Sequence, residues 1–115
     1  MLRFAIYPNF QKKHALSCAV DVCQRLHALG GEVFVDLAYR KEFSGLRYLQ
    51  FGEFTELMER VDIVIAIGGD GTMLRCAKEM IGTSAVMLGI NTGHLGFMAG
   101  LETDELDELG KLFRG

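Results

Sequence analysis

Hydrophobic residues recur at two spacings along this chain, and segments of the two kinds alternate. Short apolar runs rich in β-branched and aromatic residues predict strands. These strands span 4–8, 32–36, 62–67 and 85–89. Apolar residues three and four positions apart predict helices between and after them. These helices span 11–29, 54–61, 73–81 and a last segment that begins at 103.

Each predicted helix has an apolar face. On the first helix it consists of Leu16, Ala19, Val20, Cys23 and Leu26, and the pair Gly30-Gly31 ends the helix. On the second it consists of Phe54, Leu57, Met58 and Val61. On the third it consists of Met73, Leu74, Ala77, Met80 and Ile81, with Arg75, Lys78 and Glu79 opposite. On the last, Thr103 is the expected N-cap, and the buried stripe is Leu106, Leu109, Leu112 and Phe113.

Strands that alternate with helices predict a parallel α/β sheet with helices on both faces, in a Rossmann-like domain. The 115 residues suffice for one domain, expected to span 1–115. The segment 37–51 has no clear period and is long for a loop in a compact domain. It is open to three interpretations: a mobile flap, a partner contact or a partly helical segment.

Composition narrows the class of protein. Half of the residues are hydrophobic, which fits either a sheet buried on both faces or a face covered by another domain or subunit. The net charge of −3, without a basic block, argues against a nucleic-acid partner. The apolar runs are too short to span a membrane. Three cysteines without a CxxC pair indicate reduced core thiols and a cytoplasmic protein.

The most informative motif follows the strand 62–67. Gly68, Gly69 and Gly71 surround the carboxylate of Asp70, and Thr72 leads into a helix. Glycines at a strand-to-helix turn let backbone N–H groups approach a phosphate. A carboxylate there repels phosphate unless it holds a cation or takes a proton, and both roles belong to phosphoryl transfer. The alternative is a tight turn in which Asp70 caps the helix near Met73.

A second glycine motif, 88–97, follows the next strand. Adjacent parallel strands would place both glycine loops side by side, where ligands of open α/β sheets bind. Gly93 and Gly96 leave room for a flat ligand. His94 and Phe97 are candidates to line an adenine pocket; the alternatives are a solvent-facing histidine and a core phenylalanine.

The linked pair GGDGTML…LGIN-x-GHLGF resembles the NAD kinases, which phosphorylate the adenosine 2′-hydroxyl of NAD. Phosphofructokinases and diacylglycerol kinases are similar at GGDGT alone. The resemblance implies that Asp70 is the catalytic base. It also implies nucleotide contacts at Gly68, Gly69, Asp70, Gly71, Thr72, Leu74, Arg75, Asn91, His94 and Phe97. Met98 departs from the aromatic or aliphatic residue of other members, which leaves its contact in doubt.

The resemblance further implies ATP or polyphosphate as donor, Mg²⁺ or another divalent cation, and a homo-oligomeric full-length protein. The family's second, β-rich domain, with its Asn-Glu pair, is absent from this sequence. We therefore expect half of a cleft, which turns over little alone. Two alternatives stay open: a nucleotide-binding module without catalysis, and a GGDGT kinase for lipid or sugar. The sequence leaves open the donor and the choice between NAD and NADH.

Overall fold

The computed structural model describes residues 1–12, 14–92 and 101–113. Six parallel strands form one sheet in the order β3-β2-β1-β4-β5-β6. The strands are β1 (Arg3–Pro8), β2 (Glu32–Asp36), β3 (Gln50–Gly52), β4 (Ile63–Gly68), β5 (Val86–Asn91) and β6 (Leu101–Glu102). The expected parallel α/β fold is confirmed, and its strand order is that of a Rossmann sheet.

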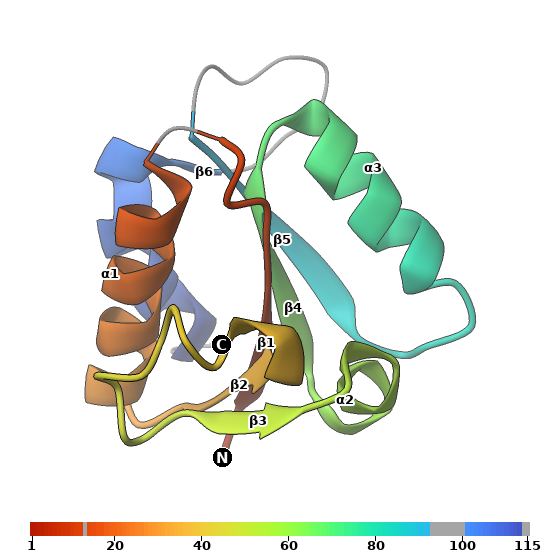
Figure 1. Ribbon diagram of the computed structural model, residues 1–115, viewed down its shortest axis with the longest axis horizontal. Coiled ribbons are helices and arrows are strands. Elements are labelled where there is room, and N and C mark those ends of the chain that lie inside the picture. Colours follow the sequence, from red (N-terminus) through yellow and green to blue (C-terminus); the bar gives the residue numbers. More distant parts are fainter. Residues whose placement is uncertain (13, 93–100, 114–115) are drawn as a thin grey trace.

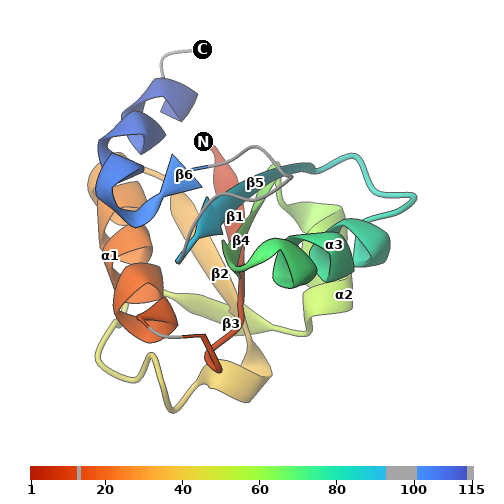
Figure 2. The same ribbon diagram turned by 90° about the horizontal axis from the view of Figure 1, so that it is seen from above.

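Helices cover both faces of this sheet. The helices are α1 (Ala15–Ala28), η1 (Leu37–Tyr39), α2 (Phe54–Arg60), α3 (Asp70–Glu79) and η2 (Thr103–Phe113), of which η1 and η2 are 3₁₀ helices. Figures 1 and 2 show α1 and η2 on one face and α2 and α3 on the other. Each pair of helices packs on its own cluster of buried side chains, so the sheet lies between two apolar layers.

The strands are apolar because both of their faces are buried. Along β1, Phe4 and Ile6 join the cluster under α1, whereas Ala5 and Tyr7 join the one under α2 and α3. The central strands β1 and β4 pair over five residues, from Phe4 with Ile63 to Pro8 with Ile67. A doubly covered sheet thus accounts for the hydrophobic composition.

Helix α1 begins later than the sequence predicts. A turn precedes it, because the side chain of Asn9 accepts a hydrogen bond from the Gln11 N–H at 3.1 Å. His14 then adopts a left-handed conformation, with φ of 65°, before the first helical residue. An Asx turn of this kind competes with helical hydrogen bonds, so the helical spacing before residue 15 is not used.

The buried faces of α1 and α3 differ from the predicted ones. The buried residues of α1 are Ala15, Cys18, Ala19, Val22, Cys23 and Leu26, whereas Leu16 is 41% exposed. On α3, Leu74 is 54% exposed and Ile81 beyond it is 80% exposed, while Cys76 is buried. The rotation of α3 follows from its contact with β5. A Cβ on Gly89 would lie 2.6 Å from the Met73 sulfur, so Met73 packs directly on the strand backbone.

The segment 37–51 is partly helical, as one of the three interpretations held, and it leads into a strand that the sequence did not predict. Asp36 organises its start: one carboxylate oxygen accepts from the Ala38 N–H at 2.8 Å and the other from the Phe54 N–H at 2.9 Å. Phe43 and Leu49 anchor the segment in the core under α1. It is therefore a folded part of the domain, with strand β3 at its end.

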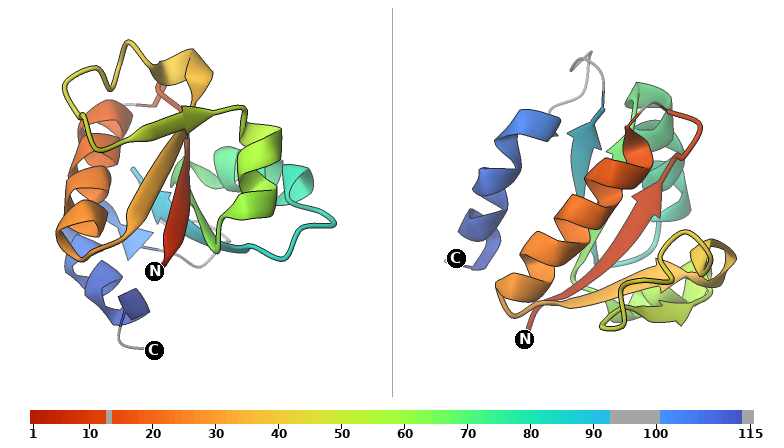
Figure 3. Two further views of the ribbon diagram at one scale, coloured as in Figure 1. Left: turned by 90° about the horizontal axis from the view of Figure 1, so that it is seen from below. Right: turned by 60° about the vertical axis from the view of Figure 1, so that its left-hand side comes forward.

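The last part of the chain also differs from the prediction. Strand β6 was not expected, and the last helix is a 3₁₀ helix with a break at Glu105. Leu106 and Leu109 are buried and face α1, beside which η2 lies in Figure 3. The predicted buried stripe is confirmed, with Leu112 and Phe113 partly buried against the same core. The predicted cap at Thr103 concerns a side chain outside the described part.

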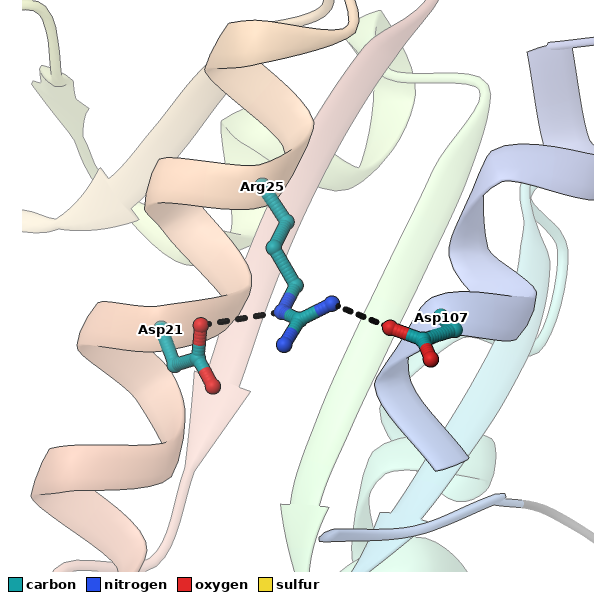
Figure 4. A network of polar contacts seen from close by, with 3 residues as sticks. All are labelled: Asp21, Arg25 and Asp107. Atoms are coloured by element: carbon teal, nitrogen blue, oxygen red, sulfur yellow. Dashed lines mark hydrogen bonds and ion pairs between the residues drawn. The ribbon is translucent and has the colours of Figure 1, made fainter. Parts of the chain in front are cut away.

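An ion-pair network joins α1 to η2. The Arg25 guanidinium donates to the Asp21 carboxylate at 2.9 Å within α1 and to the Asp107 carboxylate of η2 at 2.8 Å (Figure 4). All three side chains are well exposed to solvent. These partners raise the pKa of Arg25 further above its ordinary value, so the guanidinium stays charged. Exposed ion pairs of this kind contribute little to the stability of the fold.

The thiols behave as core residues. Cys18, Cys23 and Cys76 are free and buried, as the sequence predicted. Burial raises the pKa of Cys23 and of Cys76 to about 12. Within the described ranges, no helix combines the length and the apolar character needed to cross a membrane.

Candidate functional site

The first glycine motif lies where β4 passes into α3. Gly68 ends the strand, Gly69 is the extended N-cap, and Asp70 is the first helical residue. Gly68 is required sterically, because a Cβ there would lie 2.4 Å from the Thr72 hydroxyl oxygen. The first turn of α3 therefore folds back onto the strand end, and its backbone N–H groups lie at the carboxyl edge of the sheet.

Asp70 is the first residue of α3 and does not occupy its N-cap position. The N-cap is Gly69, whose carbonyl accepts the Met73 N–H at 3.1 Å. The Asp70 carboxylate is instead part of the first turn, where the helix dipole favours a negative charge. Asp70 is half-buried, and its Oδ1 is shielded from solvent. Asp70 thus lies at the start of α3, at the carboxyl edge of the sheet.

The second motif begins beside the first, as predicted. Strand β5 pairs with β4 in a register that places Asn91 opposite Gly68. The Thr92 N–H then donates to the Gly68 carbonyl at 3.0 Å. Asn91 is 3% exposed at this edge. The expected proximity of the two loops is confirmed up to residue 92; His94 and Phe97 lie outside the described residues.

A third segment, which motif analysis missed, lies on the other side of the GGDGT turn. It is the connection from β1 to α1, where the Asn9 amide donates to the Thr72 hydroxyl at 3.2 Å. Lys12 extends over Gly69: a Cβ on that glycine would lie 3.4 Å from the Lys12 Cε and 3.7 Å from its Nζ. No motif marks this connection. Its place follows from the strand order, because β1 and β4 are the strands at which a Rossmann sheet switches direction.

A cleft of about 320 Å³ lies between this connection and α3. Its lining residues are Asn9, Gln11, Lys12, Gly71, Thr72 and Arg75. The two cations come from different elements. Arg75 is held toward the cleft by a 3.5 Å contact with the Thr72 hydroxyl. Positive side chains beside a helix N-terminus suit an anionic ligand, and we call this the cationic cleft.

A second, larger cleft of about 710 Å³ adjoins it. Four aromatic residues line it: Tyr7, Phe10, Tyr39 and Phe54. Burial raises the pKa of Tyr7 to about 12, with a further contribution from its hydrogen bond to Glu79. The phenol therefore stays neutral and acts as a hydrogen-bonding group. We call this the aromatic cleft.

The structure places most of the predicted site residues together, but not all of them. The residues from Gly68 to Thr72 and Asn91 lie together at the carboxyl edge of the sheet. Thr72 is buried and its hydroxyl is used within the protein, so its side chain holds the turn in place. Arg75 lines both clefts, whereas Leu74 lines neither cleft and is exposed on α3.

Residues 4–113 match the family model described as the ATP-NAD kinase N-terminal domain. The NAD kinase of Symbiobacterium thermophilum is 33% identical over an alignment of 121 positions, which covers 100% of this chain and 40% of that protein. The NAD kinase of Clostridium kluyveri is 45% identical over 56 residues, 48% of this chain and 20% of that protein.

The fold also matches a solved structure, the crystal structure of yeast NADH kinase complexed with NADH. The TM-score is 0.77 at 22% sequence identity, over 99% of this chain and 37% of that one. At this identity the match supports the fold alone. The chain thus spans about 40% or less of the length of these relatives.

Proposed function

The chain belongs to the family of ATP-NAD kinase N-terminal domains, and from this premise we propose that it contributes one half of an NAD kinase active site. The reaction would transfer a phosphoryl group from ATP or polyphosphate to the adenosine 2′-hydroxyl of NAD. The observation that carries the proposal is the pairing of Gly68 with Asn91, which brings both family motifs to one edge of the sheet next to Asp70.

In this proposal Asp70 is the catalytic base. A ribose hydroxyl is a poor nucleophile at neutral pH, and phosphoryl transfer passes through a loose transition state in which positioning matters most. A carboxylate in hydrogen-bond reach orients the hydroxyl and accepts its proton. The backbone N–H groups of Gly69 and Gly71 would hold phosphate oxygens, because they belong to the start of α3.

Asn91, His94 and Phe97 are proposed to contact NAD from the β5 side. Asn91 ends that strand opposite Gly68, which supports its assignment. The roles of Leu74 and Arg75 as nucleotide contacts stay predictions. Of these two, Arg75 has the better support, since it lines both clefts beside the GGDGT turn.

A divalent cation fits this site only together with its nucleotide. The described residues contain no group of three or more His, Cys, Asp or Glu side chains that could hold a metal ion. Mg²⁺ commonly takes one or two protein carboxylates and completes its shell with water and substrate phosphates. Asp70 is the carboxylate in place for this role. When bound, the ion would offset the repulsion between that carboxylate and the donor phosphates.

The test is an assay of NADP formation by the complete protein, supplied with NAD, ATP and Mg²⁺. Asp70→Asn keeps the shape of the side chain but removes the base, and loss of general base catalysis reduces turnover about 100- to 10,000-fold. Asp107→Asn is the control, since that carboxylate is exposed on η2. Near-normal turnover of Asp70→Asn would exclude the assigned role.

Two further arms of the assay address the alternatives. Transfer to diacylglycerol or fructose 6-phosphate in place of NAD would overturn the choice of acceptor. Nucleotide binding without any transfer, in the complete protein, would favour a binding module. Replacement of NAD by NADH in the same assay determines which redox form is preferred.

A further inference from the structure

The aromatic cleft has the dimensions and chemistry of a site for a planar ligand. Its volume of about 710 Å³ falls within the range of small-molecule pockets. The rings come from separate elements: Tyr7 from β1, Tyr39 from η1 and Phe54 from α2. Tyr7 and Phe54 pack at 4.9 Å between ring centroids, and Phe10 and Tyr39 meet edge to face at the same distance. These two ring pairs form the apolar part of the walls, and Tyr7 and Tyr39 remain partly exposed.

The polar groups of this cleft favour hydrogen-bond donors and disfavour anions. Carboxylates of Asp36, Glu42 and Glu79 line it, against the single cation Arg75 among its lining residues. Asp36 already accepts two backbone N–H groups. Glu42 and Glu79 are exposed residues, so their carboxylates are accessible from solvent. Such acceptors match the hydroxyls of a ribose or the amino group of a base, and they repel phosphate.

The two clefts are parts of one continuous surface, because both are lined by Asn9, Gln11 and Arg75. Their charges are opposite in character. One end is aromatic and acidic, and the other carries Lys12 and Arg75 at the start of α3. A ligand that fits both ends has a flat, uncharged, donor-bearing part joined to a polyanionic part. A nucleoside polyphosphate has this form.

We infer that the aromatic cleft binds the base and ribose of a nucleoside triphosphate donor, whose phosphates extend along the cationic cleft toward the GGDGT turn. This inference rests on the proposed function and resolves the choice that the sequence left open between ATP and polyphosphate. Polyphosphate has no base, so it could not stack on the rings of the aromatic cleft. The segment 37–51 gains a role as well, since Tyr39 and Glu42 form one wall of the donor site.

Binding measurements on the chain itself test the inference without requiring turnover. The probes are the non-hydrolysable analogue AMP-PNP and inorganic tripolyphosphate, each with Mg²⁺, titrated by calorimetry or by amide chemical shifts. Base–aromatic stacking contributes enough that Tyr39→Ala should weaken AMP-PNP binding about tenfold or more. The same variant should bind tripolyphosphate like the wild type. Lys12→Ala should weaken both probes, and Lys12→Arg should restore most of the loss.

Tyr48→Ala is the matched control. Tyr48 is also a half-buried tyrosine of the segment 37–51, but it stacks on His27 at 4.0 Å and lines neither cleft. It should bind both probes normally. Circular dichroism of each variant confirms that it folds, and Tyr39→Phe, which keeps the ring, should behave like the wild type if Tyr39→Ala is poorly folded.

Four results would overturn the inference. AMP-PNP affinity that is unchanged in Tyr39→Ala would mean that the base lies elsewhere, and so would an equal loss in Tyr48→Ala. Weakened NAD binding in Tyr39→Ala, with AMP-PNP unaffected, would assign the cleft to the acceptor. Failure of this inference can be told apart from failure of the proposed function. Normal turnover of Asp70→Asn would refute the proposed catalytic base without changing these binding results. NADP formation with tripolyphosphate, in a protein that does not bind AMP-PNP, would refute the donor site alone.

Discussion

Gly68→Ala should destabilise the protein through one identifiable clash. The new Cβ would lie 2.4 Å from the Oγ1 of Thr72, 2.8 Å from its Cβ and 3.0 Å from its Cγ2. Thr72 is 1% exposed, and its hydroxyl is held by the Asn9 amide, so the side chain cannot rotate away without losing that bond. The backbone has to move instead, which separates the end of β4 from the first turn of α3.

The cost is that of overpacking a well-filled site, about 1–3 kcal/mol in the free energy of unfolding. Gly71→Ala is the matched control within the same motif. Its Cβ would meet only the Arg75 guanidinium, at 3.9 Å, and the residue is exposed on α3. Replacing a helical glycine by alanine stabilises by roughly 0.5–1 kcal/mol. Two glycines three residues apart should therefore respond with opposite signs.

Urea unfolding followed by circular dichroism measures both variants. Thr72→Ala provides a double-mutant cycle with Gly68→Ala, because it removes two of the three clashing atoms. The double variant should be less destabilised than the sum of the single variants. A neutral Gly68→Ala, or strict additivity with Thr72→Ala, would refute the steric argument. Activity in the complete protein should fall for Gly68→Ala, since the turn that carries Asp70 moves.

The remaining predictions concern other parts of the fold. Asp36→Ala should cost about 1–2 kcal/mol in urea unfolding, because two backbone N–H groups lose their acceptor, and Asp36→Asn, which keeps one acceptor oxygen, should cost less. Burial raises the pKa of Cys23 from 9.0, its ordinary value, to about 12. The stability that the buried neutral thiol contributes is therefore complete below pH 9. It is lost as the pH rises toward 12, because the unfolded chain loses this proton first. The free energy of unfolding should therefore decline between pH 9 and pH 12, and Cys23→Ala should show a shallower alkaline decline. Arg25→Ala should cost less than about 1 kcal/mol, and a double-mutant cycle with Asp107→Ala should give a coupling that vanishes at high salt.

The sequence predicts the central part of the sheet because its strands are buried on both faces. The predicted 32–36 coincides with β2, and the other three predicted strands are shifted at their ends by no more than two residues. The edge strands β3 and β6 were missed for a physical reason. They have three and two residues, and such short strands have too few side chains to show a period.

Helix positions were predicted better than helix faces. Periodicity alone allowed Leu74 and Ile81 to share a face with Met73, but α3 is rotated by the contact between Met73 and Gly89 on β5. That contact joins residues that are distant in sequence, so no local pattern reports it. The break in η2 at Glu105 was missed although its contact is local: the Glu105 side chain accepts from the Glu102 N–H at 3.1 Å.

The candidate site was predictable where it followed from topology. Once two parallel strands are adjacent, the residues at their carboxyl ends must meet, and this placed Asn91 beside the GGDGT turn. Asn9 and Lys12 were missed because no motif marks them. Their place follows from the pairing of β1 with β4, which becomes evident only when the order of the strands is known.

The strand order also explains why the GGDGT turn, rather than either neighbouring loop, carries the proposed base. Strand β4 lies between β1 and β5, so its turn borders Lys12 on one side and Asn91 on the other. A base that accepts a proton from an acceptor hydroxyl while facing a donor phosphate needs a neighbour for each substrate. In the proposed arrangement, the β1 connection would contact only the donor, and the end of β5 only the acceptor. Asp70, at the start of the helix between them, is the carboxylate of this edge that can serve both.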